Sequence, residues 1–170
     1  GIQGVSKSGG AGASASDRRV ALVISNGFAR SYRRTGAGLS VSAIAGDGTA
    51  MQRDYDYSSA VHFSDLRRPE DIGREAGERA VKRLNPRKVK SQAVPVIYDR
   101  RVASGLLGHL LGAINGAAIA RGTSFLKGKL GERVFPKGTR IVDDPLKPRG
   151  LASRPFDAEG LPVSRHCWID

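Results

Sequence analysis

Alternating apolar and polar positions predict β-strands in the first third of the chain. Residues 18–25 (RRVALVIS) and 39–45 (LSVSAIA) both alternate with the period of a strand that has one buried face. Asn26-Gly27 follows the first of these segments, and both residues tolerate positive φ, so the pair predicts a type I′ turn into a return strand over residues 28–34. Residues 51–61 supply a further strand. Together these strands predict an antiparallel meander with one face buried and the other exposed to solvent.

An amphipathic helix is predicted over residues 69–84. Apolar residues recur there at helical spacing, Pro69 suits the first turn, and Asn85-Pro86 ends the pattern. After the helix, residues 94–98 (VPVIY) predict a short strand, and Asp99 is the expected N-cap of the next helix.

Residues 101–121 form the most informative apolar segment. Nineteen uncharged residues separate Arg101 from Arg121, which is close to the length of a membrane span, and glycines recur at helical spacing. We favour a buried helix, because His109 and Asn115 would lie near the bilayer centre and much of the segment is Gly and Ala. A ridge of glycines lowers helix stability, so it predicts close approach by another backbone. A membrane helix remains the alternative.

The rest of the chain completes an α+β fold class: an antiparallel meander, an amphipathic helix, a strand and a Gly-rich buried helix. Residues 1–17 are rich in Gly, Ser and Ala and predict a linker or severed end. Residues 18–135 are expected to form a middle α+β domain. Residues 136–170 are expected to begin a truncated C-terminal β-rich domain, with strands over 139–143 and within 161–170.

Composition narrows the possible classes of protein. The 170 residues include 28 Lys and Arg against 16 Asp and Glu, a formal net charge of +12, which is compatible with nucleic-acid binding. The basic residues occur as isolated doublets and only 6% of residues are aromatic, so a base-stacking surface is not favoured. Cys167 is the single cysteine, which excludes an internal disulfide and favours a cytoplasmic setting. Met51 is the single methionine, so we expect an excised middle segment of a longer protein.

Short sequence tags lie in order along the chain: Gly12–Ser16 (GASAS), Ser25–Phe28 (SNGF), Met51–Tyr57 (MQRDYDY), Ser58-Ser59, Gly105–His109 (GLLGH), Arg121–Lys127 (RGTSFLK), Val142–Pro145 (VDDP), Pro148–Leu151 (PRGL) and Arg154–Gly160 (RPFDAEG). No single tag is decisive, but their ordered combination is specific. Together they resemble the TldD/TldE peptidase family, and specifically its TldE (PmbA) branch of bacterial proteins.

The resemblance implies where the zinc ligands would lie if this chain carried them. The TldD branch carries a His-Glu-x-x-x-His motif on the helix before its Gly-Thr-Ser stretch, where two His bind zinc and the Glu activates water. Aligned on residues 122–124, those positions are Leu107, Gly108 and Gly112 in this chain, and none can bind a metal or act as a base. His109 falls one residue past the Glu position and is interpreted as a structural histidine.

The resemblance therefore implies a non-catalytic TldE-like subunit of a heteromeric zinc metalloprotease that degrades or matures peptides. It implies no catalytic residue, metal ligand or cofactor in this chain, with zinc only in a TldD-like partner. Extended peptides are the expected substrates, and neither direct nucleic-acid contact nor membrane insertion is expected. Candidate chamber or partner contacts are Gly105, Gly108, His109, Gly112, Asn115, Arg121, Thr123 and Ser124.

Two functional alternatives stay open. The longer protein could be a metal-dependent peptidase in its own right, with ligands outside these residues. The net charge and the family's label as a modulator of DNA gyrase favour a basic nucleic-acid-associated module, although we interpret that label as a consequence of proteolysis.

Overall fold

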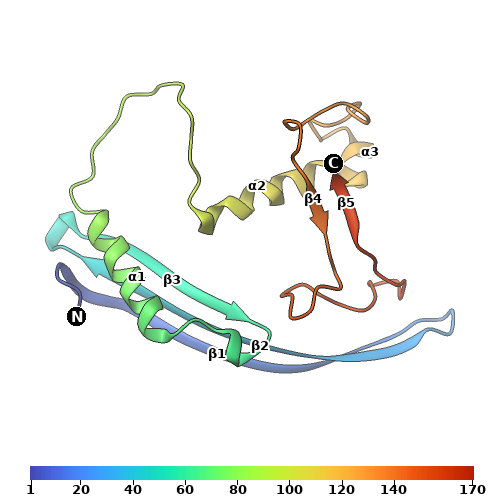
Figure 1. Ribbon diagram of the computed structural model, residues 1–170, viewed down its shortest axis with the longest axis horizontal. Coiled ribbons are helices and arrows are strands. Elements are labelled where there is room, and N and C mark those ends of the chain that lie inside the picture. Colours follow the sequence, from blue (N-terminus) through green and yellow to red (C-terminus); the bar gives the residue numbers. More distant parts are fainter. The chain divides into compact units, whose positions relative to one another are not determined.

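Three antiparallel strands form the main sheet in the computed structural model, which describes residues 1–170. Strands β1 (Val5–Val23), β2 (Ala29–Ala45) and β3 (Gln52–Ala60) are hydrogen-bonded in that order (Figure 1). The predicted antiparallel meander followed by helices is therefore confirmed. The segments expected as two strands, 28–34 and 39–45, are one continuous strand, because β1 pairs with β2 throughout residues 29–45.

The expectation that residues 1–17 form a linker is wrong, because β1 begins at Val5. The register pairs Ala11 with Val41 and Ala15 with Ala37. Gly, Ser and Ala have weak intrinsic strand preference, yet they satisfy their main-chain groups by pairing with β2, a partner remote in sequence. Local composition therefore gave no signal for this half of the strand.

The hairpin predicted at Asn26-Gly27 forms, but its turn differs from type I′. Gly27 has φ of 90° while Asn26 keeps a negative φ. The Ile24 N–H donates to the Phe28 carbonyl at 3.0 Å, which leaves a three-residue loop. This is the arrangement in which one glycine in the left-handed region closes the hairpin.

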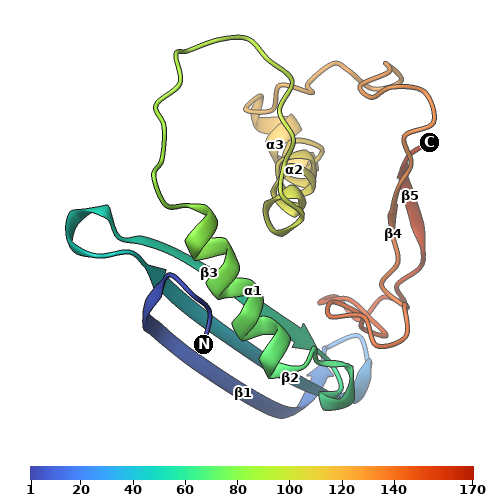
Figure 2. The same cartoon turned by 60° about the vertical axis from the view of Figure 1, so that its left-hand side comes forward.

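Helix α1 (Pro69–Lys82) lies along one face of the sheet (Figure 1, Figure 2). The prediction for this segment is confirmed: Pro69 occupies the first turn, acidic side chains follow it, and basic side chains occupy the last turn. The shared core consists of small side chains, chiefly Ala43, Ala45, Ala76 and Ala80. Small residues on both surfaces let the helix backbone approach the strands closely.

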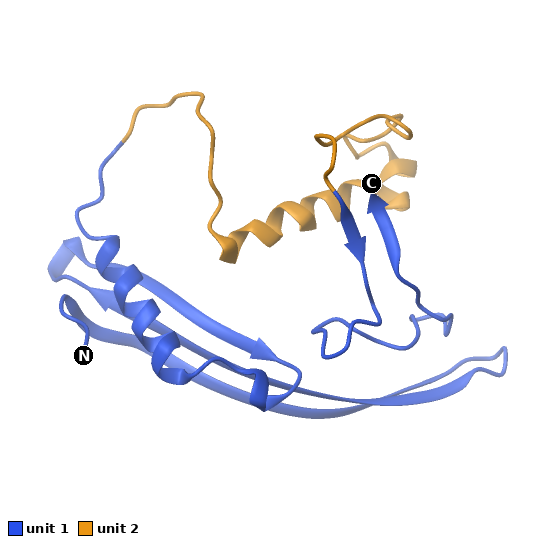
Figure 3. Cartoon of the chain, viewed as in Figure 1, with its two compact units in different colours: residues 1–88, 140–170 blue, residues 89–139 orange.

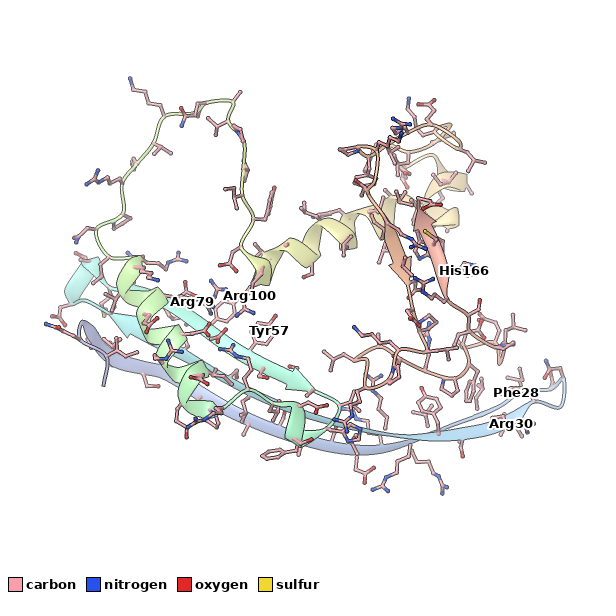
Figure 4. The ribbon with its side chains drawn as sticks, viewed as in Figure 1. Phe28, Arg30, Tyr57, Arg79, Arg100 and His166 are labelled. Carbon is pink, nitrogen blue, oxygen red and sulfur yellow. The ribbon has the colours of Figure 1, made fainter.

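A partly buried network of ion pairs, centred on the buried Asp56, joins α1 to β3. Asp56 is 2% exposed, and its two carboxylate oxygens accept hydrogen bonds from Arg67 Nη1 at 2.6 Å and Arg79 Nη1 at 2.7 Å. Glu75 accepts from the second nitrogen of each guanidinium at 2.6 Å, which closes the network. Figure 4 labels Arg79 on the helix. Burial alone would raise the pKa of Asp56, but the hydrogen bonds from Arg79 and Arg67 outweigh it and lower that pKa.

The chain divides into two units, residues 1–88 with 140–170 and residues 89–139 (Figure 3). The first unit also contains the two-stranded antiparallel sheet of β4 (Ile141–Asp143) and β5 (His166–Ile169), within segments predicted as strands. The domain division expected between residues 135 and 136 concerns the longer protein and stays a prediction.

The second unit contains two helices, α2 (Arg100–Ala113) and α3 (Gly116–Arg121). The strand expected at 94–98 does not form, because this segment has no pairing partner and its residues are exposed. The expectation of one buried helix over 101–121 is also wrong: the helix breaks at Asn115, and only Leu110 and Ala113 of α2 are buried.

Removal of the Asp56 carboxylate is expected to destabilise the first unit strongly. Asp56→Ala leaves Arg67 and Arg79 with Glu75 as their one remaining carboxylate partner and removes a charge-assisted hydrogen bond from each, a loss of about 3 kcal/mol. Glu78→Ala is the control, since Glu78 makes a 3.2 Å pair with Arg74 on the exposed side of α1 and should cost at most about 1 kcal/mol. Urea unfolding followed by circular dichroism measures both, and equal losses would contradict this role.

The same network makes the free energy of unfolding depend on pH in the acidic range. Because the pKa of Asp56 is lower in the folded protein than its ordinary value, its contribution is present above about pH 4 and is lost as the pH falls through the folded pKa. The free energy of unfolding should therefore decrease on acidification below about pH 4. Urea titrations over that range should show a shallower decrease for Asp56→Asn, and identical slopes would exclude the effect.

Candidate functional site

The junction of α2 and α3 gathers Asn115, Thr123 and Ser124 through hydrogen bonds to the helix ends. The Asn115 side chain accepts from the Ala117 N–H at 3.0 Å and the Ala118 N–H at 3.3 Å, so it caps α3. Ser124 Oγ donates to the Ala113 carbonyl at 2.6 Å, which satisfies the end of α2. Thr123 Oγ1 donates to the Ala118 carbonyl at 3.3 Å. These predicted site residues thus shape the local backbone.

Gly122 allows this arrangement by ending α3 in the left-handed conformation. Its φ of 73° suits glycine, and its N–H donates to the Ile119 carbonyl at 3.0 Å. The chain then reverses so that Ser124 reaches the end of α2. A residue with a Cβ would be strained in this conformation, so glycine is the residue that lets α3 end and the chain turn here.

The remaining candidate contacts face open space within this chain. Gly105, Gly108 and Gly112 on α2 and Gly116 on α3 have no neighbouring atom within 4 Å of an added Cβ. The close backbone approach that these glycines predict is therefore not made by residues 1–170. His109 and Arg121 are exposed.

The residues present do not fit a zinc ion. Leu107, Gly108 and Gly112 carry no donor atom at the positions of the TldD-branch motif. No three His, Cys, Asp or Glu side chains of residues 1–170 gather at a spacing that could hold a metal. His109 therefore has no set of co-ligands among these residues.

Two clusters of charged side chains in the structure have no counterpart among the sequence predictions. One is the partly buried network around Asp56, whose signal was the alternation of Asp54, Asp56 and Ser58 with the exposed Tyr55 and Tyr57. The other is a basic cavity beside β2. Its residues lie far apart in sequence and share no local pattern, so only the folded chain reveals it.

Comparison with known families covers nearly the whole chain. The sequence model of the PmbA/TldA metallopeptidase central domain matches residues 2–84, and that of the C-terminal domain matches residues 91–170. The chain belongs to the PmbA/TldA metallopeptidase family. The resemblance to the TldD/TldE (PmbA) family is thereby confirmed. The two matches meet near the segment between α1 and α2, which has no regular secondary structure.

Individual relatives agree with this assignment. The chain is 40% identical over 141 residues to the metalloprotease PmbA of Escherichia coli O157:H7, and 39% identical over 137 residues to a PmbA homologue of Haemophilus influenzae. These matches cover 83% and 81% of this chain but 31% and 30% of the relatives. The chain thus spans about a third of the length of those proteins.

Solved structures share the fold. A protein of Thermotoga maritima described as a modulator of a DNA gyrase superposes with a TM-score of 0.89 at 27% identity, covering 99% of this chain and 39% of that one. A protein of Bacteroides thetaiotaomicron described in the same words gives 0.81 at 31% identity, covering 94% and 37%. TldE of Thermococcus kodakarensis gives 0.76 at 23% identity, covering 94% and 36%, and supports the fold alone.

The apolar segment that suggested a membrane helix is divided between α2, of 14 residues, and α3, of 6 residues. Neither these nor any other helix has the length and apolar character needed to cross a bilayer.

Replacement of the Asn115 cap should loosen the start of α3. Asn115→Ala removes the acceptor of the Ala117 N–H, at a cost of about 1 kcal/mol, so exchange of that amide should accelerate roughly fivefold. Asn115→Asp keeps an acceptor and should retain slow exchange. Hydrogen exchange measured by NMR distinguishes them, and equal acceleration in both variants would contradict the capping role.

Proposed function

We propose that the chain forms part of a TldE-like, non-catalytic subunit of a heteromeric zinc metalloprotease that degrades or matures peptides in the cytoplasm. One observation carries this proposal: the positions that would hold zinc and activate water are Leu107, Gly108 and Gly112 in a chain that belongs to a metallopeptidase family. A TldD-like partner would supply the zinc, which polarises a peptide carbonyl and activates water when bound.

In this proposal the residues of α2 and α3 form a surface that contacts the partner subunit or the peptide. The four glycines leave a strip of backbone without side chains, and Leu106, Leu107 and Leu111 beside it are about half exposed. A surface of this kind suits a second backbone that approaches closely. The candidate contacts are those expected from the sequence: Gly105, Gly108, His109, Gly112, Asn115, Arg121, Thr123 and Ser124.

The names of the relatives favour a second candidate function. Curated relatives at 40% and 39% identity are named metalloproteases, and this chain spans only 31% and 30% of their length. Ligands elsewhere in the longer protein could make it a metal-dependent peptidase on its own.

The description of two solved relatives as modulators of a DNA gyrase is the reason to retain a nucleic-acid-associated role as well.

Metal analysis of the full-length protein separates the non-catalytic subunit role from a peptidase that acts on its own. The full-length chain purified alone should contain no stoichiometric zinc and hydrolyse no unfolded peptide, whereas the mixture with its TldD-like partner should do both. His109→Ala in the assembled complex should leave zinc content unchanged, because His109 lacks co-ligands. A His→Ala change in the partner's motif is the positive control for zinc loss.

Two results would overturn the proposal. Stoichiometric zinc with peptide hydrolysis by the full-length chain alone would show a peptidase in its own right. Loss of zinc on His109→Ala would make this histidine a ligand.

A further inference from the structure

Part of β2 has an unpaired outer edge. β1 pairs with β2 over residues 29–45, but β3 pairs only with residues 37–45, ending at Ala60 opposite Ala37. Beyond that point the chain turns away, and Thr35 Oγ1 donates to the Val61 carbonyl at 2.7 Å. The edge of β2 over residues 29–34 therefore faces no strand. An exposed edge of this kind is a template for pairing with an extended chain.

A cavity of about 570 Å³ borders this edge. Tyr32, Arg33, Arg34 and Thr35 all line it. Successive side chains of a strand point to opposite faces, so four consecutive residues can line one cavity only if it lies along the strand's edge. The opposite wall is the 145–155 segment, which precedes Phe156.

Two contacts hold that wall in place within the first unit. The Phe156 ring packs edge-to-face on Phe28 and Tyr32, with ring centroids 5.2 Å and 5.3 Å apart. Arg149 Nη1 donates to Asp65 Oδ1 at 2.6 Å. Figure 4 shows Phe28 and Arg30 near the tip of the β1–β2 hairpin. The cavity is thus built by the strands and by a segment more than 100 residues away in sequence.

The charge of the cavity is unbalanced. Four of its lining side chains are arginines, and none is a carboxylate. Arg33 is paired with Asp17 and Arg149 with Asp65, both from outside the lining. Arg34 and Arg154 form no ion pair, and Arg34 is half-buried.

The strand register adds to this imbalance. Arg34 lies directly opposite Arg18, and Arg33 directly opposite Arg19. Like charges at such positions repel, so the fold retains basic charge here at a cost in stability. Two guanidiniums without acceptors beside an open strand edge define a site for an anion attached to an extended backbone.

We propose that this cavity binds an extended acidic peptide, which adds to the edge of β2 while its carboxylates pair with Arg34 and Arg154. The proposal deepens the proposed function, on which it rests, by naming acidic peptides as a substrate class. A peptide fits better than a nucleic acid for two reasons. The strand edge offers main-chain pairing, and Tyr32, the one Phe, Tyr or Trp side chain that lines the cavity beside His62, already packs against Phe156.

Fluorescence anisotropy with the full-length protein that contains these residues tests this directly. The probe is a fluorescein-labelled Glu-Val-Glu-Val-Glu-Val peptide, with Gln-Val-Gln-Val-Gln-Val as the neutral match. The double variant Arg34→Gln/Arg154→Gln should bind the acidic peptide at least tenfold more weakly, and the neutral peptide should bind the unaltered chain at least tenfold more weakly. Amide shifts at residues 29–35 should accompany binding, as strand addition requires.

The control variant is Arg53→Gln/Arg87→Gln, which makes the same change in net charge at exposed residues outside the cavity. It should bind within twofold of the unaltered chain, and circular dichroism should show that both variants are folded.

Three results would overturn the proposal. The first is no binding of the acidic peptide at about 1 mM, a limit of about −4 kcal/mol. The second is an equal loss in both double variants, which would indicate diffuse surface charge. The third is tighter binding of a single-stranded oligonucleotide that the cavity variant also abolishes. Because this test involves neither zinc nor hydrolysis, its failure is distinct from failure of the proposed subunit role.

Discussion

The buried carboxylate of Asp56 is the constraint on which the first unit depends. Two guanidiniums, one before α1 and one within it, converge on this side chain, and Glu75 completes their pairing. A carboxylate that is 2% exposed is costly to desolvate unless each oxygen has a donor, so the network fixes the position of the helix over β3. The alanine core beneath α1 fixes the position of the helix less strongly, because small side chains make few specific contacts.

The sheet extends beyond the region that α1 covers, and this has consequences for binding. Past Ala60 the first two strands continue as a ribbon, supported by main-chain pairing and by Phe156. That extension leaves an edge of β2 open and brings basic side chains from two remote parts of the chain to one cavity. The first unit therefore has one part in which ion pairs join the helix to the sheet and another in which basic side chains lie beside an open strand edge.

The second unit has a different character. Its helices expose glycines and leucines, and its polar residues Asn115 and Ser124 form hydrogen bonds to the helix ends. Residues 1–170 span about a third of the relatives' length. The proposed contact role for these helices, with the chemistry located in a partner, would account for a metallopeptidase family member with Leu107, Gly108 and Gly112 at these positions.

The sequence by itself determined the elements whose signals are local. Proline at the start of α1, dipole-compatible charges at its ends, the Asn26-Gly27 hairpin and the Asp99 cap all act within a few residues. The family could be recognised as well, because its tags are short and ordered. Only the tertiary structure decided that the Gly, Ser and Ala residues of β1 form a strand, since their partner is β2. It alone also placed Arg79 against Asp56 and Arg154 in the same cavity as Arg34, because burial and charge balance depend on contacts between residues far apart in the chain.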